Sequence, residues 1–236
     1  LQQASDVSVR QYRAGLVAGR SVADICCSIG SDAMAFAEHR CDVVGFDIDP
    51  VRIAIARHNA DVMGLSAAFE MRDVTQMTYA HYDVMFYDPA RRKSDGNRIY
   101  DVEQYIPPLF LVHQFHAEQI AIKLSPAVDL NQLHHYGGQV EFVSVEGSLK
   151  EAVLWMNRED THPMATLIHD NHVHHLHYDH DAQVDVRPPG AWLFEPDASV
   201  LRAGLVQHLA EQLGATMLDE TIAYVSMDAR VDTVWG

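Results

Sequence analysis

The sequence predicts an α/β protein built around an open parallel sheet, and two neighbouring apolar runs carry that prediction. The first run starts at Val22, ends in small residues, turns around Gly30 and leads into a helix-like segment from Asp32. The second run, residues 43–46, stops at Asp47. Strand, turn, helix and strand in this order form the repeating unit of parallel sheets, which bind ligands beyond the carboxyl ends of their strands.

The alternation of helices and strands continues along the chain. A short amphipathic helix is expected at residues 7–16, before the first strand. Asp49 and Pro50 predict the N-cap and first residue of a second main helix, which ends at Gly64. Further apolar runs predict five more strands, at residues 67–71, 82–87, 119–124, 140–145 and 150–156. The last two form an antiparallel pair, so we expect seven strands in the main sheet.

Length and composition limit the classes of protein that fit. The 236 residues, 48% of them hydrophobic, can hold one sizeable domain with a small appendage, and no run of 18 apolar residues predicts a membrane span. Cys26 and Cys27 are adjacent and predict small core residues in a reducing compartment, hence a cytoplasmic protein. The chain starts at Leu1 rather than Met, which indicates a processed or trimmed start. Nothing in the sequence indicates an obligate protein partner.

The turn after the first strand has the pattern Asp24-x-Cys26-x-Ser28-x-Gly30. It lacks the three glycines that a pyrophosphate requires, but it matches the register acid-x-G-x-G-x-G with two small replacements. In this the chain resembles the class I methyltransferases, and the run at residues 46–64 looks especially like trimethylguanosine synthase and related RNA methyltransferases. The resemblance implies a Rossmann-like seven-stranded sheet and S-adenosylmethionine as the cofactor. That cofactor has no phosphate, so Cys and Ser are tolerable in the turn.

The carboxyl ends of the first three strands would hold this cofactor, with Cys26, Ser28 and Gly30 forming the turn beneath it. Asp47 can accept hydrogen bonds from both ribose hydroxyls, and Asp24 is expected near the methionine ammonium group. The remaining assignments are Ile48 against the adenine face, Asp73 at the adenine amino group, and the Val74 amide at a ring nitrogen. Asp32, also placed at this site, is expected to cap the helix after the turn.

Asp88 and Pro89 follow the fourth strand, where class I enzymes meet their acceptor. Amino-methylating relatives carry [DNS]-P-P-[FYW] here, whereas this chain has Ala90 and Arg91 at the last two positions. Asp88 and the Pro89 carbonyl would accept hydrogen bonds from an exocyclic amine. A basic loop follows, and we expect it to bind substrate through Arg91, Arg92, Lys93, Arg98 and Tyr100. Tyr87 or Tyr100 would supply the missing aromatic ring, and the alternative for the arginines is surface ion pairing.

The character of the chain changes near residue 158, so we expect a catalytic domain at residues 1–158 and a small α+β domain at 159–236. Residues 192–204 look like the THUMP-like domain attached to some bacterial class I methyltransferases, and the pattern stops in mid-element, which indicates an incomplete domain. Six histidines lie between residues 169 and 180. His172 with His174, or His175 with His177, would bind zinc, but no ordered ligand pattern is complete. An exposed hairpin without metal is therefore the prediction.

Three functions are compatible with these patterns. The first is methylation of an RNA base at an exocyclic or ring nitrogen, for which RNA is the partner. The second is a small-molecule or protein methyltransferase, which the net charge of −16 favours because acidic chains repel nucleic acid. The third is a non-catalytic module that binds the cofactor or RNA.

Overall fold

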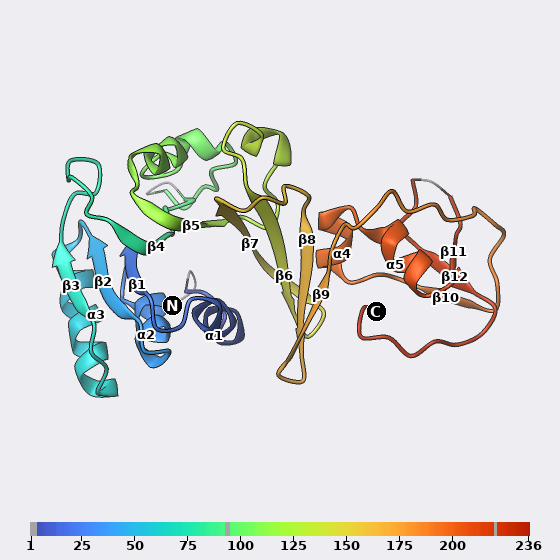
Figure 1. Ribbon diagram of the computed structural model, residues 1–236, viewed down its shortest axis with the longest axis horizontal. Coiled ribbons are helices and arrows are strands. Elements are labelled where there is room, and N and C mark those ends of the chain that lie inside the picture. The colour runs from blue at the N-terminus through green and yellow to red at the C-terminus, as the bar shows by residue number, and fades with distance from the viewer. Residues whose placement is uncertain (1–3, 93–94, 220) are drawn as a thin grey trace. The chain divides into compact units, whose positions relative to one another are not determined.

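The computed structural model describes residues 4–92, 95–219 and 221–236 (Figure 1). The chain forms two compact units, which are described separately. The first contains Leu1–Gly138 and Leu154–Glu159, and the second contains Gln139–Val153 and Asp160–Gly236. The expected domain boundary after residue 158 stays a prediction, because compactness does not test which segments fold independently. No helix in the described ranges is both long and apolar enough to cross a membrane.

The first unit contains the predicted parallel sheet. Its strands are β1 (Ser21–Ile25), β2 (Asp42–Asp47), β3 (Ala68–Met71), β4 (Tyr82–Tyr87) and β5 (Ala117–Leu124), with the end of β7 (Ser148–Met156). They lie in the order β3-β2-β1-β4-β5-β7, and the pairs from β3 to β5 are parallel. This order confirms the Rossmann-like α/β fold. All five parallel strands consequently end at the same edge of the sheet.

Helices accompany these strands (Figure 1): α1 (Val7–Leu16), α2 (Ser31–Glu38) and α3 (Pro50–Met63), with the 3-10 helices η1 (Val102–Gln104), η2 (Leu109–Gln114) and η3 (Leu130–Leu133). The start of α3 is as predicted, since the Asp49 side chain accepts the amides of Val51 and Arg52, and Pro50 is the first helical residue. Gly64 ends this helix in a left-handed conformation, φ 66°.

The prediction that Asp32 caps α2 is wrong. The N-cap of α2 is Gly30, at φ 80° and without a side-chain hydrogen bond, and Asp32 lies inside the first turn. Its carboxylate is buried and accepts hydrogen bonds from Arg13 at 2.7 Å and Ser5 at 3.0 Å. A buried carboxylate is stabilised by a buried cation. Asp32 therefore pairs with Arg13 instead of capping the helix.

Close packing explains two glycines near the turn after β1. A Cβ on Gly45, in β2, would lie 2.7 Å from a ring carbon of Phe69, which is closer than side chains pack. A Cβ on Gly30 would lie 3.0 Å from the same ring. Phe69 of β3 therefore holds the turn and β2 together, and it needs a small residue at both positions.

The second unit contains β6 (Gln139–Val145), the start of β7, β8 (Met164–His169) and β9 (His172–Leu176), in the order β7-β6-β8-β9. Strands β8 and β9 are additional to the predicted seven: β8 is parallel to β6, and β9 is antiparallel to β8. The unit also contains α4 (Ala198–Ala203), α5 (Val206–Gln212) and a small antiparallel sheet in the order β10-β12-β11. The strands of that sheet are β10 (Trp192–Phe194), β11 (Thr216–Met217) and β12 (Val225–Met227).

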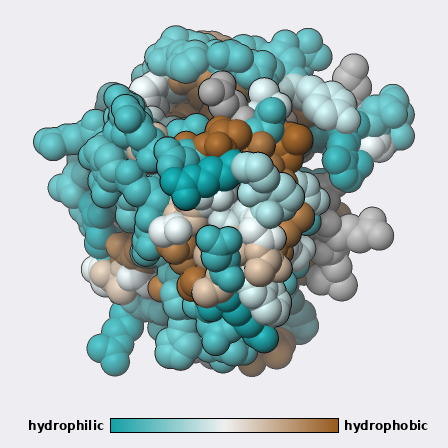
Figure 2. All heavy atoms as spheres, turned by 90° about the vertical axis from the view of Figure 1, so that its right-hand side faces the viewer, coloured by the Kyte–Doolittle hydropathy of each residue, from teal (hydrophilic) through white to brown (hydrophobic). Residues whose placement is uncertain are grey.

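Figure 2 shows the face that carries the small sheet. Hydrophobic residues gather in patches among hydrophilic residues and residues of intermediate hydropathy on this face. Exposed apolar side chains of the second unit include Trp192, Leu193 and Ile222.

Candidate functional site

Three aspartates stand at the carboxyl ends of adjacent strands in the first unit. Asp24 is the next-to-last residue of β1, Asp47 ends β2, and Asp88 directly follows β4. The Asp88 amide donates to the Ile25 carbonyl oxygen at 3.1 Å, which fixes the start of the loop after β4 against the end of β1. The sheet thus brings all three predicted aspartates to one edge, as expected for a ligand site.

The turn after β1 has positive φ angles at three alternate positions, although only one of these residues is a glycine. Cys26 has φ 67°, Ser28 has φ 51° and Gly30 has φ 80°. Left-handed conformations cost a non-glycine residue roughly 1–2 kcal/mol. The Cys27 amide donates to the Phe46 carbonyl oxygen at 2.9 Å, and the Gly30 amide donates to that of Cys27 at 2.9 Å. The turn therefore keeps the backbone conformation of the acid-x-G-x-G-x-G pattern, although two of its glycines are replaced. A hydrogen bond to β2 stabilises this conformation.

Asp47 links this turn to the start of α3. Its Oδ2 accepts the Ser28 amide and its Oδ1 accepts the Asp49 amide, each at 2.9 Å. Arg52 lies 3.7 Å from Oδ2, but its side chain is half exposed. Each carboxylate oxygen has a second lone pair, so Asp47 can still accept the two ribose hydroxyls for which it was predicted. The next residue, Ile48, is 64% exposed and offers an apolar face beside it.

Asp24 differs because it is 1% exposed. In the described part of the chain, neither of its carboxyl oxygens accepts a hydrogen bond of good geometry. Burial raises the pKa of Asp24 well above its usual value, and the nearby carboxylates of Asp32 and Asp88 raise it further. Arg13 and the Ala33 amide lower this pKa by less. A buried acid without a partner is costly, and a bound cation such as a ligand ammonium group would relieve that cost.

The loop after β3 adjoins the Asp47 end of the site. The Arg72 amide donates to the Asp47 carbonyl oxygen at 3.0 Å, so Asp73 follows directly beside β2. Asp73 is exposed, and hydrogen bonds from the Thr75 hydroxyl and amide lower its pKa. Val74 is buried, and its carbonyl oxygen accepts the Tyr79 hydroxyl. The adenine contacts assigned to Asp73 and Val74 stay a prediction.

After β4, where the sequence analysis expects the acceptor, Asp88 forms an ion pair that the sequence analysis missed. Lys123 of β5 donates from Nζ to Asp88 Oδ2 at 2.8 Å. The Lys123 side chain is 4% exposed and that of Asp88 is 25% exposed. The signal in the sequence was a lysine within the apolar residues 120–124, because a buried lysine requires an anionic or polar partner.

The basic loop after β4 folds back on itself, and we call its described residues, 90–92 and 95–106, the arm. Ala90 pairs with Ile106, and Arg92 pairs with Arg98, through isolated antiparallel bridges. Arg92 donates to the Gly96 carbonyl oxygen at 3.1 Å, and Tyr100 is 68% exposed. Lys93 lies outside the described residues. Among the residues that are described, no ion pair includes Arg91, Arg92 or Arg98, so the alternative of surface ion pairing finds no support there.

Known proteins are similar to this chain in sequence. Residues 22–89, which span β1 to the residue after Asp88, match the family model described as a methyltransferase domain. An uncharacterized S-adenosylmethionine-dependent methyltransferase of Mycobacterium tuberculosis is 36% identical over 234 residues, which cover 97% of this chain and 64% of that protein. The chain is thus similar to S-adenosylmethionine-dependent methyltransferases over almost its whole length. It spans less than two thirds of the length of these relatives.

Two further comparisons concern fold and substrate. The solved structure of a protein from Porphyromonas gingivalis W83, assigned as a methyltransferase, covers 99% of this chain and 63% of its own chain. The TM-score is 0.77 at 19% identity, which is a likeness of fold. An uncharacterized RNA methyltransferase of Lactiplantibacillus plantarum is 30% identical over 102 residues, 40% of this chain and 22% of that protein.

The relatives from M. tuberculosis are described as S-adenosylmethionine-dependent, and the residues at the strand ends of this chain fit that cofactor. Asp24 has the buried, unpartnered carboxylate that a methionine ammonium group would satisfy. Asp47 keeps free lone pairs for the ribose, and Ile48 offers an exposed apolar surface to the adenine. Asp32, by contrast, already holds Arg13, so its direct contact with the cofactor stays a prediction.

Tyr87 does not supply the aromatic ring that the acceptor motif lacks, so that alternative is wrong. Its side chain is fully buried, and its hydroxyl donates to the carbonyl oxygens of Pro107 at 2.7 Å and Pro108 at 3.2 Å. The segment after the basic arm therefore packs over Tyr87. Tyr100 remains the exposed candidate from the sequence analysis.

The three cysteines of the chain do not have the environment of a reactive thiolate. Cys26 is half-buried, Cys27 and Cys41 are buried, and all three are free thiols. Burial raises the pKa of each thiol, and the neighbouring carboxylates of Asp47 and Asp24 raise those of Cys26 and Cys27 further. The reactive thiolate is consequently scarce at neutral pH.

The histidine-rich segment forms the β8–β9 hairpin of the second unit. His175 accepts or donates a hydrogen bond with the Thr166 hydroxyl at 3.0 Å, and His169 pairs with Glu146 at 2.7 Å. Among the described residues, Glu146, His169 and Asp170 are the group whose ligand atoms come within 4.8 Å of one another. This group does not include the predicted pairs of His172 with His174 or His175 with His177. It is largely exposed and already linked by hydrogen bonds, so we assign no metal to it.

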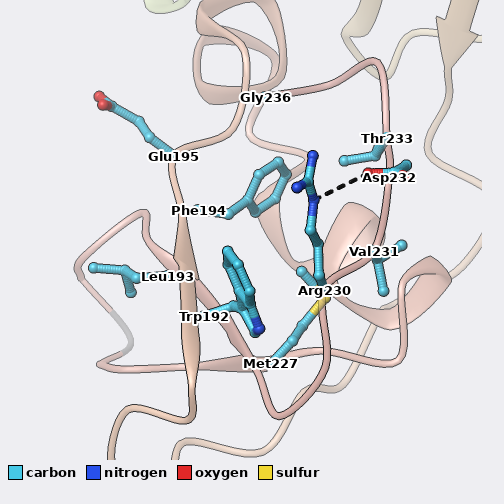
Figure 3. A pocket seen from close by; sticks show the side chains of 10 residues that line it. All are labelled: Trp192, Leu193, Phe194, Glu195, Met227, Arg230, Val231, Asp232, Thr233 and Gly236. Carbon is cyan, nitrogen blue, oxygen red and sulfur yellow. Dashed lines mark ion pairs between the residues drawn. The ribbon is translucent and has the colours of Figure 1, made fainter.

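A cavity of about 430 Å³ lies beside β10 in the second unit (Figure 3). The rings of Trp192 and Phe194 lie side by side, and Arg230 lies 5.9 Å from the Trp192 ring centre while pairing with Asp232 at 3.2 Å. The other lining residues are Leu193, Glu195, Met227, Val231, Thr233 and Gly236. None of the predicted cofactor or substrate residues lines this cavity.

Proposed function

We propose that this methyltransferase transfers a methyl group to a nitrogen of an RNA base. The observation that carries the proposal is the acceptor end of the sheet: Asp88 is followed by an arm on which Arg91, Arg92 and Arg98 have no acidic partner among the described residues. The chain has 33 acidic residues for 17 lysines and arginines, so unpaired arginines beside the acceptor position are unexpected without an anionic ligand.

The chain needs chiefly to align the acceptor. When bound, the cofactor would supply a sulfonium-activated methyl group: the acceptor nitrogen would bond to the methyl carbon as the carbon–sulfur bond breaks, the thioether would leave, and the nitrogen would lose one proton. Asp88 accepts a hydrogen bond from the acceptor amine, directs the nitrogen lone pair toward the methyl group and accepts the departing proton. The Pro89 carbonyl oxygen accepts the second hydrogen of a primary amine.

The thiols favour nitrogen over carbon as the acceptor. Methylation of a pyrimidine carbon requires covalent activation of the ring by a strong nucleophile such as a thiolate. All three cysteines have raised pKa values, and the Asp88 carboxylate itself helps to raise the pKa of Cys26, so none of them is a ready thiolate nucleophile. A nitrogen needs no such activation.

RNA is favoured as the class of substrate by two observations. An arginine can stack on a base or grip a phosphate, and Tyr100 of the arm is exposed for stacking. The relative from L. plantarum is described as an RNA methyltransferase. The sequence resemblance of residues 192–204 to a THUMP-like domain is part of this proposal and stays a prediction. Repulsion by the net charge of −16 is screened beyond about 8–10 Å at physiological salt, so a local basic arm can still bind a polyanion.

The test is transfer of tritiated methyl from labelled cofactor into total RNA and, separately, into total protein and small molecules. We expect label in RNA, at a base nitrogen. Label in protein or small molecules alone would support the second candidate, which the acidic net charge favours. Cofactor binding without transfer to any of the three would support a non-catalytic module.

The arm provides a second test through the salt dependence of RNA binding. Each phosphate contact that is lost lowers the log–log salt slope by about one. The double change Arg91→Ala and Arg92→Ala should weaken binding to total transfer RNA and reduce this slope by about two, with cofactor affinity unchanged. A matched control is Arg187→Ala, since Arg187 is an exposed arginine of the second unit paired with Asp185. Equal binding by wild type and the double variant would contradict the assignment of the arm.

A further inference from the structure

Lys123 is a buried cation at the acceptor end, and the register of the sheet explains its position. In the parallel pair of β4 and β5, Tyr87 lies opposite Ile122. Asp88 follows Tyr87, and Lys123 follows Ile122. The two side chains therefore lie beside each other, and their charged atoms are 2.8 Å apart. The alignment of strands therefore fixes the pair.

Burial makes this pair different from the other ion pair at the strand ends. The Arg52 side chain near Asp47 is 52% exposed and 3.7 Å away, and such surface pairs restrict a carboxylate weakly. Lys123 is 4% exposed at 2.8 Å. A buried ammonium group cannot replace a lost partner with water. The contact between Lys123 and Asp88 is therefore expected to persist.

The pair leaves the two oxygens of Asp88 in different situations. Oδ2 accepts Lys123, whereas no hydrogen bond to Oδ1 is found in the described part of the chain. The side chain is a quarter exposed, so the carboxylate is accessible to a ligand. Without Lys123, rotation about the Cβ–Cγ bond would interchange the two oxygens.

We infer that Lys123 is a positioning residue that pins Oδ2 of Asp88 and so directs Oδ1 to the acceptor. This inference rests on the proposed function and narrows its substrate class. One fixed carboxylate oxygen and the Pro89 carbonyl oxygen form two hydrogen-bond acceptors, which suits a primary amine with two N–H groups. Among base nitrogens, that favours an exocyclic amino group over a ring nitrogen, which has at most one N–H.

The central experiment is a double-mutant cycle on methyl transfer to RNA. Lys123→Met keeps the length of the side chain and removes its charge, and we expect kcat to fall about 10–100-fold. The affinity for S-adenosylhomocysteine should stay within about threefold, because Lys123 acts on the acceptor side. In the Asp88→Asn background the same change should cause little further loss, because Lys123 acts through Asp88. The exposed Lys150→Met is the matched control and should behave as wild type.

A merely structural role gives a different result. Equal losses of kcat in the wild-type and Asp88→Asn backgrounds, or a parallel loss of cofactor affinity, would overturn the inference. The acceptor provides a further check: RNA from the reaction should carry label on exocyclic amino groups, and label confined to ring nitrogens would contradict the substrate class.

Failure of the proposed function can be distinguished from failure of this inference. If wild type transfers no methyl to RNA, the proposed substrate is wrong, and the role of Lys123 is then decided by crystal structures of wild type and Lys123→Met with S-adenosylhomocysteine. We expect the Asp88 carboxylate to be rotated or to occupy several positions in the variant. An Asp88 side chain unchanged in position and order would overturn the inference.

Discussion

The two halves of the strand-end site depart from the family pattern in different ways. In the cofactor half, Cys26 and Ser28 replace glycines but keep positive φ angles of 67° and 51°. In the acceptor half, Ala90 and Arg91 replace a proline and an aromatic residue, and the loop becomes an arm with exposed arginines. The cofactor half is thus constrained by backbone shape, which different small residues can adopt. The acceptor half differs in the side chains that it presents, and under the proposed function these side chains would set the specificity.

The aspartates near the strand ends also differ from one another, in whether the folded chain stabilises their charge. Asp32 is buried with Arg13 and Ser5 as partners, and Asp47 accepts two backbone amides, so both are stabilised without a ligand. Asp24 is buried without such a partner, and its pKa is raised. Above the usual pKa of an aspartate, the unfolded chain releases a proton that folded Asp24 retains, so its burial lowers stability as the pH rises. A carboxylate that weakens the free protein is expected where a ligand supplies the missing charge.

The largest expected effect concerns the acceptor half. Asp88→Ala removes the group that orients the acceptor and accepts its proton, and we expect turnover to fall by at least about 100-fold. Affinity for S-adenosylhomocysteine, measured by calorimetry, should change by less than about threefold if the halves act separately. Asp61→Ala, at an exposed position of α3, is the control. Turnover that survives Asp88→Ala would place the acceptor elsewhere.

A smaller effect is expected for Asp47 in the cofactor half. Each hydrogen bond to a charged group contributes about 1.5–3 kcal/mol, so Asp47→Ala should weaken S-adenosylhomocysteine binding by at least about tenfold. Asp49→Ala is a matched control, since Asp49 caps α3 and its loss should lower the free energy of unfolding by about 1 kcal/mol. Equal cofactor affinity for wild type and Asp47→Ala would remove the ribose assignment.

The smallest effect tests whether backbone shape is the constraint on the turn. Cys26→Gly relieves a left-handed non-glycine residue, and after the entropy of glycine is subtracted we expect a gain of up to about 1 kcal/mol in the free energy of unfolding. Cys27→Gly should instead destabilise, because Cys27 is buried and is not among the residues with positive φ. Urea denaturation of both variants measures the difference. A loss of stability in Cys26→Gly would show that the thiol matters more than the backbone.

Local patterns could be predicted from the sequence, whereas pairings between distant residues could not. Asp49, Pro50 and Gly64 mark the ends of α3 because capping depends on neighbouring residues alone. The cap expected from Asp32 was wrong because its partner Arg13 lies on another helix, 19 residues earlier. Tyr87 was expected to be accessible, but the carbonyl oxygens that bury its hydroxyl come from residues 107 and 108.

The ion pair of Asp88 is also a pairing between distant residues, which the sequence alone does not reveal. The sequence placed Asp88 at the end of β4, but Lys123 is 35 residues away and its contact depends on the register of β4 and β5. A lysine in an apolar strand indicated that a partner must exist, without indicating which one. The role of Asp24 was predicted from the family pattern, and its lack of a partner became visible only in the folded chain.

Asp24 offers the most direct test of the central claim, that the strand ends form a built site for S-adenosylmethionine. Calorimetry would compare S-adenosylhomocysteine with 5′-methylthioadenosine, which lacks the amino-acid group, in wild type and Asp24→Asn. We expect wild type to prefer S-adenosylhomocysteine and Asp24→Asn to lose at least about tenfold of that preference, while the free variant unfolds at a higher temperature than wild type. An unchanged preference in Asp24→Asn would contradict the account, because the buried carboxylate would then not serve the cofactor.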